Sequence, residues 1–91
     1  MKKSFEIIVS GTVQGIGYRY FAVRSANMLN IKGFIRNLYD GRVQVVACGE
    51  EGKIRAFIDI LGIGPIYAAV SKLTVNEIET TEHYKDFRVE Y

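Results

Sequence analysis

The chain has 91 residues, a formal net charge of +2 and 48% hydrophobic residues, values that fit one small globular domain. The charge is too small to argue for a nucleic-acid partner, and one cysteine with one histidine can form neither an internal disulfide nor a closed zinc site. No apolar stretch is long enough for a signal peptide or a membrane span, so we expect a single domain over residues 1–91 in the cytoplasm.

The first predicted elements are a strand, a glycine-rich loop and a helix. Apolar side chains alternate along residues 5–9, which predicts a strand with one apolar face. Three glycines within residues 11–17 predict a loop. A helix is expected over about 18–29, because an apolar stripe with helical spacing runs through Tyr18, Phe21, Ala22, Ser25, Ala26 and Leu29. Asn30 then suits the end of the helix, since asparagine tolerates a positive φ.

The middle of the chain reads as a hairpin followed by a second helix. Residues 31–38 and 42–49 are apolar-rich runs, and the Asp-Gly pair between them is a strong hairpin signal. An amphipathic helix is predicted over about 51–61. The loop at 62–65, which holds the only proline, should end this helix.

Two strands are predicted to close the fold. The apolar residues of 70–78 fall slightly out of register, which indicates a strand with a bulge, and residues 87–91 alternate in a short last strand. The element order predicts an α+β, ferredoxin-like βαββαβ sandwich. We expect an antiparallel sheet of four to five strands with both helices on one face.

Chemistry is expected where the first loop, the start of the first helix and the end of the second strand meet at one sheet edge. Loop glycines let backbone N–H groups converge, a helix N-terminus is partly positive, and Arg19 adds a guanidinium fork that matches phosphate oxygens. Asn37 ends the second strand about 10 Å away, across two strand spacings. By themselves, these residues do not distinguish an anion site from a simpler arrangement. In that arrangement the loop is a tight turn, Arg19 is solvated and Asn37 only stabilises the hairpin.

Three segments of the chain resemble the acylphosphatase family. GTVQGIGYR at 11–19 is similar to the family signature, GFIRN at 33–37 to its second motif, and GPIYAAV at 64–70 to a further pattern. The order and spacing of these segments match the family over nearly the whole chain. Asn30 stands where relatives often have glycine and Phe34 where many have tryptophan, and neither residue touches the expected chemistry.

The resemblance implies an enzyme that hydrolyses acyl phosphates to a carboxylate and inorganic phosphate, with no metal ion and no cofactor. Arg19 would hold the phosphate and Asn37 would position the attacking water. The phosphate-binding loop that the resemblance implies comprises Val13, Gln14, Gly15, Ile16, Gly17, Tyr18 and Arg19. We expect a monomer whose partner is a small-molecule acyl phosphate, with no nucleic acid and no membrane.

Two other functions stay open at this point. The first is a non-hydrolytic domain that binds acyl or carbamoyl phosphate, of the kind found inside larger maturation proteins; a predicted fold that is complete by Tyr91 favours a free-standing enzyme. The second is an RNA-binding module of the same topology, suggested by KGFIRNLY at 32–39. The RNA-recognition signature belongs on the third strand, however, and this segment lies on the second.

The remaining candidate side chains have simpler interpretations. Cys48 is predicted to be a small buried hydrophobe, and His83 a solvated loop residue. Arg36 and Arg42 are expected close to the predicted site, where they either raise the positive potential or serve as surface charges.

Overall fold

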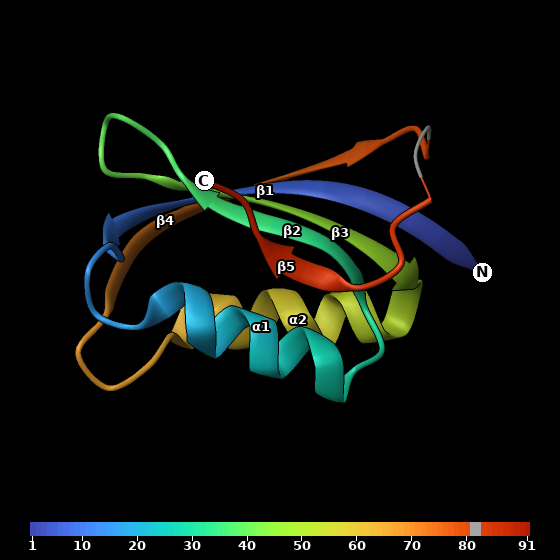
Figure 1. The fold of residues 1–91 in the computed structure, drawn as a ribbon, viewed down its shortest axis with the longest axis horizontal. Coiled ribbons are helices and arrows are strands. Elements are labelled where there is room, and N and C mark those ends of the chain that lie inside the picture. The colour runs from blue at the N-terminus through green and yellow to red at the C-terminus, as the bar shows by residue number, and fades with distance from the viewer. Residues whose placement is uncertain (81–82) are drawn as a thin grey trace.

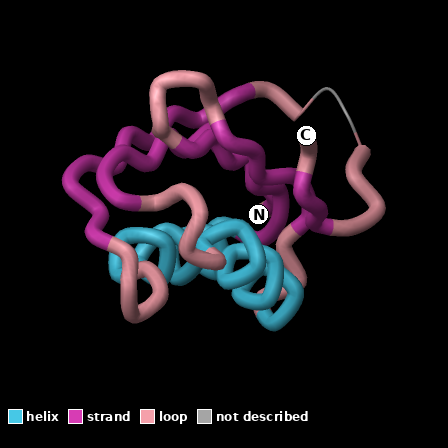
Figure 2. The backbone as a smooth tube through the Cα atoms, turned by 60° about the vertical axis from the view of Figure 1, so that its left-hand side comes forward, coloured by secondary structure: helices cyan, strands magenta, loops and turns pink. Residues whose placement is uncertain are grey.

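The computed structural model describes residues 1–80 and 83–91, which form a five-stranded sheet with two helices packed on one face (Figure 1). In chain order the elements are β1 (Lys2–Thr12), α1 (Tyr18–Met28), β2 (Lys32–Asn37), β3 (Val43–Glu50), α2 (Glu51–Ile63), β4 (Ala69–Ile78) and β5 (Phe87–Val89). The predicted ferredoxin-like α+β fold is confirmed. Figure 2 shows both helices on the same side of the sheet, whose other face carries no helix.

The strand order is β4-β1-β3-β2-β5, and β3 pairs antiparallel with both of its neighbours. β1 and β2 therefore run parallel with β3 between them, as predicted. β5 pairs with β2 in parallel, so the complete sheet is mixed and not antiparallel throughout as expected. The chain enters β5 from the end of the sheet where β4 finishes, and it must then run opposite to β4, which is the direction of β2 (Figure 1).

The core lies between the sheet and the two helices. Its members are the apolar stripes that the sequence periodicity predicted, and they include Ile7, Val9, Tyr18, Ala22, Ala26, Ile35, Val43, Val45, Ala47, Ile54, Phe57 and Leu61, each at most 1% exposed. The three-residue strand β5 is held by Phe87, whose ring packs edge-on against Phe57 at 5.6 Å between centroids. This contact brings the last residues of the chain alongside α1 and α2.

The junction between β1 and β4 differs from the predicted loop. Gly11 and Thr12 belong to β1 and not to a loop. Ser10 pairs with Lys72 but Gly11 pairs with Val70, so the register shifts there and the predicted bulge is confirmed. A Cβ on Gly11 would lie 2.0 Å from the carbonyl oxygen of Ala69, so only glycine allows this pairing.

The helix ends agree with the prediction to within two residues. Asn30 follows α1 with φ 56°, as expected for a left-handed terminator. α2 continues through Gly62 to Ile63, because Gly64, with φ 72°, is the glycine that breaks the helix. Tyr91 lies beyond β5, whose last residue is Val89. None of the described helices has the length and apolarity needed to cross a membrane.

Candidate active site

The loop between β1 and α1 turns the chain from the sheet into the helix over residues 13–17. Gly15 and Gly17 adopt left-handed dihedrals, with φ of 76° and 81°. A Cβ at either position would meet no atom within 4 Å, so glycine is needed here for its dihedral and not for space. Val13 is 1% exposed and anchors the loop in the core. Left-handed residues in succession with helical ones turn neighbouring N–H groups to one side, which is how a backbone forms an anion-binding nest.

The start of α1 leaves its backbone donors open. Gly17 is the N-cap, no side chain of the described residues caps the helix, and its first turn holds no acidic residue. The first helical hydrogen bond is donated by the backbone N–H of Phe21 to the carbonyl of Gly17, at 3.0 Å. The N–H groups of Tyr18, Arg19 and Tyr20 precede that bond and have no partner within the helix. Together with the helix dipole, they make this end of α1 suited to a bound anion.

Arg19 carries the positive charge at this loop. It is half-buried and lines a hollow of about 540 Å³ together with Gly15 and Gly17 on one side and β5 on the other. Its guanidinium carbon lies 5.4 Å from the ring centroid of Tyr91, a cation–π contact that fixes one face of the group. Among the described residues no carboxylate lies within ion-pair distance of Arg19. The guanidinium fork is therefore available to phosphate oxygens.

Gln14 ties the loop to the hairpin between β2 and β3. Its Nε2 donates to the carbonyl of Leu38 at 3.0 Å and to the carbonyl of Arg42 at 2.9 Å. The backbone N–H of Leu38 also donates to the carbonyl of Arg42, at 2.8 Å, so Gln14 completes the closure of the hairpin. The side chain of this predicted phosphate-loop residue therefore joins two segments of the site, and only its backbone is left for a ligand.

The side chains of Tyr18 and Ile16 also serve packing. Tyr18 is 1% exposed, and its hydroxyl donates to the carbonyl of Leu61 at 2.6 Å, which ties the start of α1 to α2. Burial raises the pKa of the Tyr18 hydroxyl well above its usual range, so it stays protonated and keeps donating. Ile16 is half-buried against the core. The side chains of Tyr18 and Ile16 are therefore used in packing, and only the backbone N–H groups of these two residues are available to bind an anion beside Arg19.

Asn37 ends β2 at the edge of the sheet where the loop lies. It pairs with Val43, which in turn pairs with Val9 near the end of β1. Side chains alternate along a strand, so Asn37 shares the helix-facing side of β2 with buried Ile35. The Oδ1 atom of Asn37 is buried and has no hydrogen-bond partner in the part of the chain that the structure describes, which is unusual for a polar atom in a folded protein. Such an acceptor is suited to a water molecule or a ligand donor.

Arg19 and Asn37 are brought to one end of the molecule but line different hollows. Asn37 lines a hollow of about 380 Å³ with Arg36, Leu38 and Tyr39, which is separate from the hollow of Arg19. The link between the two is the bond from Gln14 to the carbonyl of Leu38, the residue next to Asn37. The site thus has two halves, a cationic loop and a polar hairpin end, joined by one amide side chain.

The other charges near the hairpin are already engaged. The Nε atoms of Arg36 and Arg42 donate to Gln44 Oε1 at 2.6 Å and to Asp40 Oδ2 at 2.7 Å, respectively. The backbone N–H of Arg42, and then its side chain, hold the pKa of Asp40 below the ordinary value, so this carboxylate is no proton acceptor near neutral pH. The surface role considered for the two arginines therefore fits the structure better than a role in binding.

Three features of the site were not predicted: the ring of Tyr91 under Arg19, the two carbonyls that accept from Gln14, and the unpartnered Oδ1 of Asn37. The periodicity of the last strand marked Tyr91 only as a packing residue. His83 is exposed as predicted, whereas Cys48 is half-buried and not fully buried. Among the described residues no three His, Cys, Asp or Glu side chains gather in a metal-ligating group.

Comparisons with known proteins agree with one another. Residues 5–89 match the sequence profile of the acylphosphatase family. An acylphosphatase of Archaeoglobus fulgidus is 46% identical over 97% of this chain and 98% of its own length. The crystal structure of the acylphosphatase from Bacillus subtilis superposes with a TM-score of 0.94 at 33% identity and covers both chains completely. HypF from T. kodakarensis matches the whole of this chain at 33% identity and a TM-score of 0.86, but over only 12% of its own length.

Proposed function

The chain belongs to the acylphosphatase family, and on that premise we propose that Arg19 and the loop amides hold the phosphoryl group while Asn37 positions the water that attacks it. The reaction of this hydrolase converts an acyl phosphate and water to a carboxylate and inorganic phosphate. The observation that carries the assignment of residues is the unpaired guanidinium of Arg19 beside the uncapped N-terminus of α1. Both call for a ligand with several negatively charged oxygens.

In the proposed complex the phosphoryl group sits in the hollow that Arg19 lines. Backbone N–H groups at Gly15, Gly17 and the first turn of α1 donate to its oxygens, and the guanidinium binds two of them side by side. Phosphoryl transfer needs little covalent help from a protein, so positioning and neutralising charge supply most of the catalysis. These donors are fixed by glycine dihedrals and by the first turn of a helix, so they need no rearrangement during the reaction.

Asn37 acts on the water in this proposal. Its buried Oδ1, which has no partner among the described residues, accepts a hydrogen bond from the water and turns a lone pair of the water oxygen toward phosphorus. The new bond forms between the water oxygen and phosphorus, and the bond from phosphorus to the carboxyl oxygen breaks. The carboxylate leaves with the electron pair of that bond, and the water proton passes to a phosphate oxygen. A carboxylate is a good leaving group, so no strong general acid is required.

We further propose that the chain acts as a cytoplasmic monomer without a nucleic-acid partner. The single cysteine supports a reducing compartment, because it can form no internal disulfide. The net charge of +2 supports the absence of a nucleic-acid partner. Size-exclusion chromatography with light scattering tests the monomer: a mass near 10.3 kDa is expected, and a mass of twice that value contradicts it.

The deciding experiment is benzoyl phosphate hydrolysis by the purified protein in EDTA, beside the Arg19→Ala variant. We expect rapid turnover by the wild type that is lost in the variant. Arg24→Ala is a matched control, because Arg24 lies on the same helix with a similar ring contact, 5.8 Å to Tyr20, and does not line the hollow of Arg19. Absence of turnover in a folded wild type that still binds phosphate would favour a non-hydrolytic binding domain. Full turnover in Arg19→Ala would refute the assignment of Arg19.

A further inference from the structure

A second hollow is lined by Lys2 and Lys3 at the start of β1 and by Gly49 and Glu50 at the end of β3. Figure 1 shows the N-terminus at the end of the sheet opposite to the start of α1. The hollow measures about 200 Å³, and the charged side chains that line it, His83 aside, are Lys2, Lys3, Lys32, Lys53 and Glu50. Among the residues that the structure describes, four lysines and one glutamate of the lining give a formal charge of +3, whereas the entire chain carries +2.

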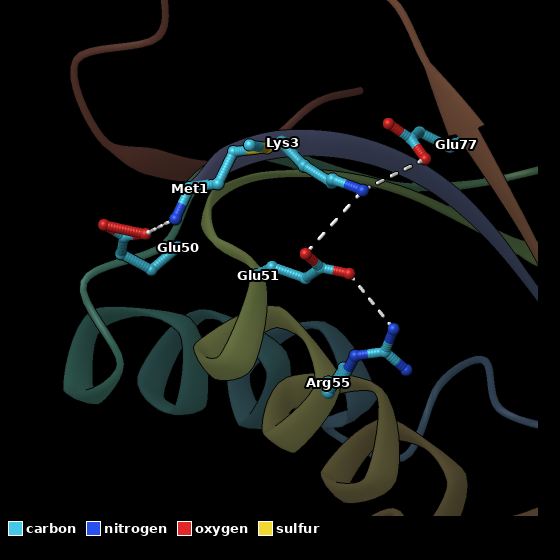
Figure 3. Close-up of polar contacts among 6 residues, drawn as sticks. All are labelled: Met1, Lys3, Glu50, Glu51, Arg55 and Glu77. Atoms are coloured by element: carbon cyan, nitrogen blue, oxygen red, sulfur yellow. Dashed lines mark hydrogen bonds and ion pairs between the residues drawn. The ribbon is translucent and has the colours of Figure 1, made fainter.

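Two of these five charges are already paired, as Figure 3 shows. The amino group of Met1 donates to Glu50 at 2.8 Å, and the ammonium of Lys3 lies 3.6 Å from Glu51 and 3.7 Å from Glu77. The pKa of the Glu50 carboxyl is lowered mainly by the hydrogen bond from that amino group, so Glu50 is ionised and its charge is compensated.

The other three lysines interact with carboxylates only at longer range, Lys2 and Lys53 with Glu50 and Lys32 with Asp86. Lys2, Lys32 and Lys53 form no hydrogen bond and no ion pair with any residue that the structure describes. Each of them comes from a different element, namely β1, β2 and the first turn of α2. Three ammonium groups around one small hollow repel one another, and an anion between them would turn that repulsion into attraction.

The floor of the hollow is polar and ordered. Ser4, Cys48 and Lys32 stand in one row across β1, β3 and β2, since Ser4 pairs with Cys48 and Cys48 with Lys32. Ser4 is 2% exposed, and its hydroxyl donates to the Cys48 sulfur at 3.0 Å and lies 2.5 Å from the hydroxyl of Thr80. Lys2 stands two residues before Ser4 on the same face of β1. Lys2 and Lys32 therefore share the face of the sheet on which Ser4 and Cys48 lie, and Lys53 lines the hollow from the first turn of α2.

We propose that this hollow is a second anion site, which binds a free phosphate-class dianion independently of Arg19. The ligand is identified by size and charge. Pockets for drug-sized molecules measure roughly 300–1,000 Å³, so a hollow of about 200 Å³ suits a small oxyanion and not a nucleotide. The lysines, and not the N-terminus of α2, carry the site, because Glu51 already occupies the first turn of that helix.

The first test is a titration of the Arg19→Ala variant with inorganic phosphate, followed by backbone amide chemical shifts, with sodium chloride at equal ionic strength as reference. We expect saturable shifts at Lys2, Ser4, Gly49 and Lys53. The double variant Lys32→Gln/Lys53→Gln should weaken the affinity by about tenfold or more, the loss expected for charge-assisted hydrogen bonds. The matched control Lys72→Gln/Arg24→Gln removes two charges elsewhere and should leave the affinity unchanged.

A second readout uses Cys48, the only cysteine of the chain, which lines this hollow. Phosphate should slow its alkylation by neutral iodoacetamide in the wild type and in Arg19→Ala, and should have little effect in Lys32→Gln/Lys53→Gln. Glu50→Gln removes the one carboxylate that the lining has among the described residues and should tighten phosphate binding, a gain that damage to the fold would not produce.

The proposal has clear contrary outcomes. It is overturned if phosphate acts no differently from chloride, or if its shifts fall only on residues 13–19 and disappear in Arg19→Ala. Phenyl phosphate carries the same phosphoryl group on a bulky ring and should bind more weakly than free phosphate. Equal or tighter binding of phenyl phosphate would refute the assignment to a free anion.

Discussion

The two helices of this protein begin in opposite electrostatic ways. α2 has Glu50 as its N-cap and Glu51 in its first turn, and the backbone N–H of Glu51 donates to the carbonyl of Met1 at 3.1 Å. α1 begins at Gly17, with no side-chain cap and no acidic residue in its first turn, and it carries Arg19 instead. Both helices pack on the same sheet, so the difference is not one of burial. Neither helix has a side-chain cap, but α2 carries a carboxylate in its first turn and one of its backbone donors is bonded to Met1, whereas α1 has a glycine N-cap and a cationic first turn.

The open start of α1 has a cost that the rest of the fold offsets. The N-cap is Gly17, and glycine in place of a capping side chain lowers stability by only about a few tenths of a kcal/mol. The start of α1 is held instead by the buried ring of Tyr18 and its hydrogen bond to the carbonyl of Leu61. These side-chain contacts hold the start of α1 in place and leave its backbone N–H groups free to donate. An anion that binds there meets donors that are already oriented.

Replacing Arg19 should have the largest effect on this open helix start. We expect Arg19→Ala to lower kcat/KM for benzoyl phosphate by about 10³-fold or more, as for arginines that stabilise transferring phosphoryl groups. Arg19→Lys should fall within about tenfold of the alanine variant, because an ammonium cannot supply two parallel donors. Steady-state kinetics at constant pH measure both variants. Near-normal turnover in Arg19→Lys would show that charge alone suffices and that the fork is not used.

Removal of the Asn37 side chain tests the other half of the site. Asn37→Ala should lower kcat by about 10²–10³-fold, by analogy with the loss of one oriented polar group. Its stability should hardly change, since Oδ1 has no partner to lose. Asn76→Ala is the control, because Asn76 is exposed on β4 and far from the hairpin. If activity and thermal midpoint by circular dichroism fall together, Asn37 is a structural residue.

These sites show which parts of the molecule could be predicted from sequence. The stripe of Tyr18, Ala22 and Ala26 predicts α1 because a helix buries residues three and four apart, a local rule that needs no tertiary information. Arg19 and Asn37 could also be singled out from short stretches of sequence, because each lies in a segment that resembles a motif of the family. The bond from Gln14 to the hairpin and the ring of Tyr91 under Arg19 join segments distant in sequence. No local pattern contains them.

The parallel pairing of β5 was missed for a related reason. Alternation of apolar residues predicts that a strand exists and which face is buried, but it does not specify the neighbour or its direction. That choice depends on where the chain crosses the end of the sheet and on the contact of Phe87 with Phe57. The exposure of Cys48 was missed because its face of the sheet carries no helix (Figure 2).

A carboxylate placed at the start of α1 should make this helix resemble α2. Tyr20 lies in the first turn of α1, 67% exposed, and Tyr20→Glu should raise the thermal midpoint relative to Tyr20→Gln through the helix dipole. The same charge should repel the phosphoryl group and raise KM by about fivefold relative to Tyr20→Gln, with little change in kcat. The glutamine variant is the control because it loses the same ring. The KM difference should shrink in high salt, and a difference that is insensitive to salt would point to shape and not charge.

The reverse change at α2 should have the smallest effect and should appear only in stability. The hydrogen bond from Arg55 and then the charge of Lys3 lower the pKa of Glu51 below its ordinary 4.5. A carboxyl with a lowered pKa in the folded state stabilises the protein above that ordinary value, and this contribution disappears as pH falls through the folded-state pKa. Glu51→Gln should therefore lower the thermal midpoint at pH 7, and the gap to the wild type should close below pH 4.5, when Glu51 becomes protonated. Glu77→Gln is a matched control, since Glu77 also contacts Lys3, at 3.7 Å, but lies on β4 and not at a helix start. If both variants lose the same stability, the contribution of Glu51 comes from Lys3 alone, and the two helix starts differ less in energy than their sequences suggest.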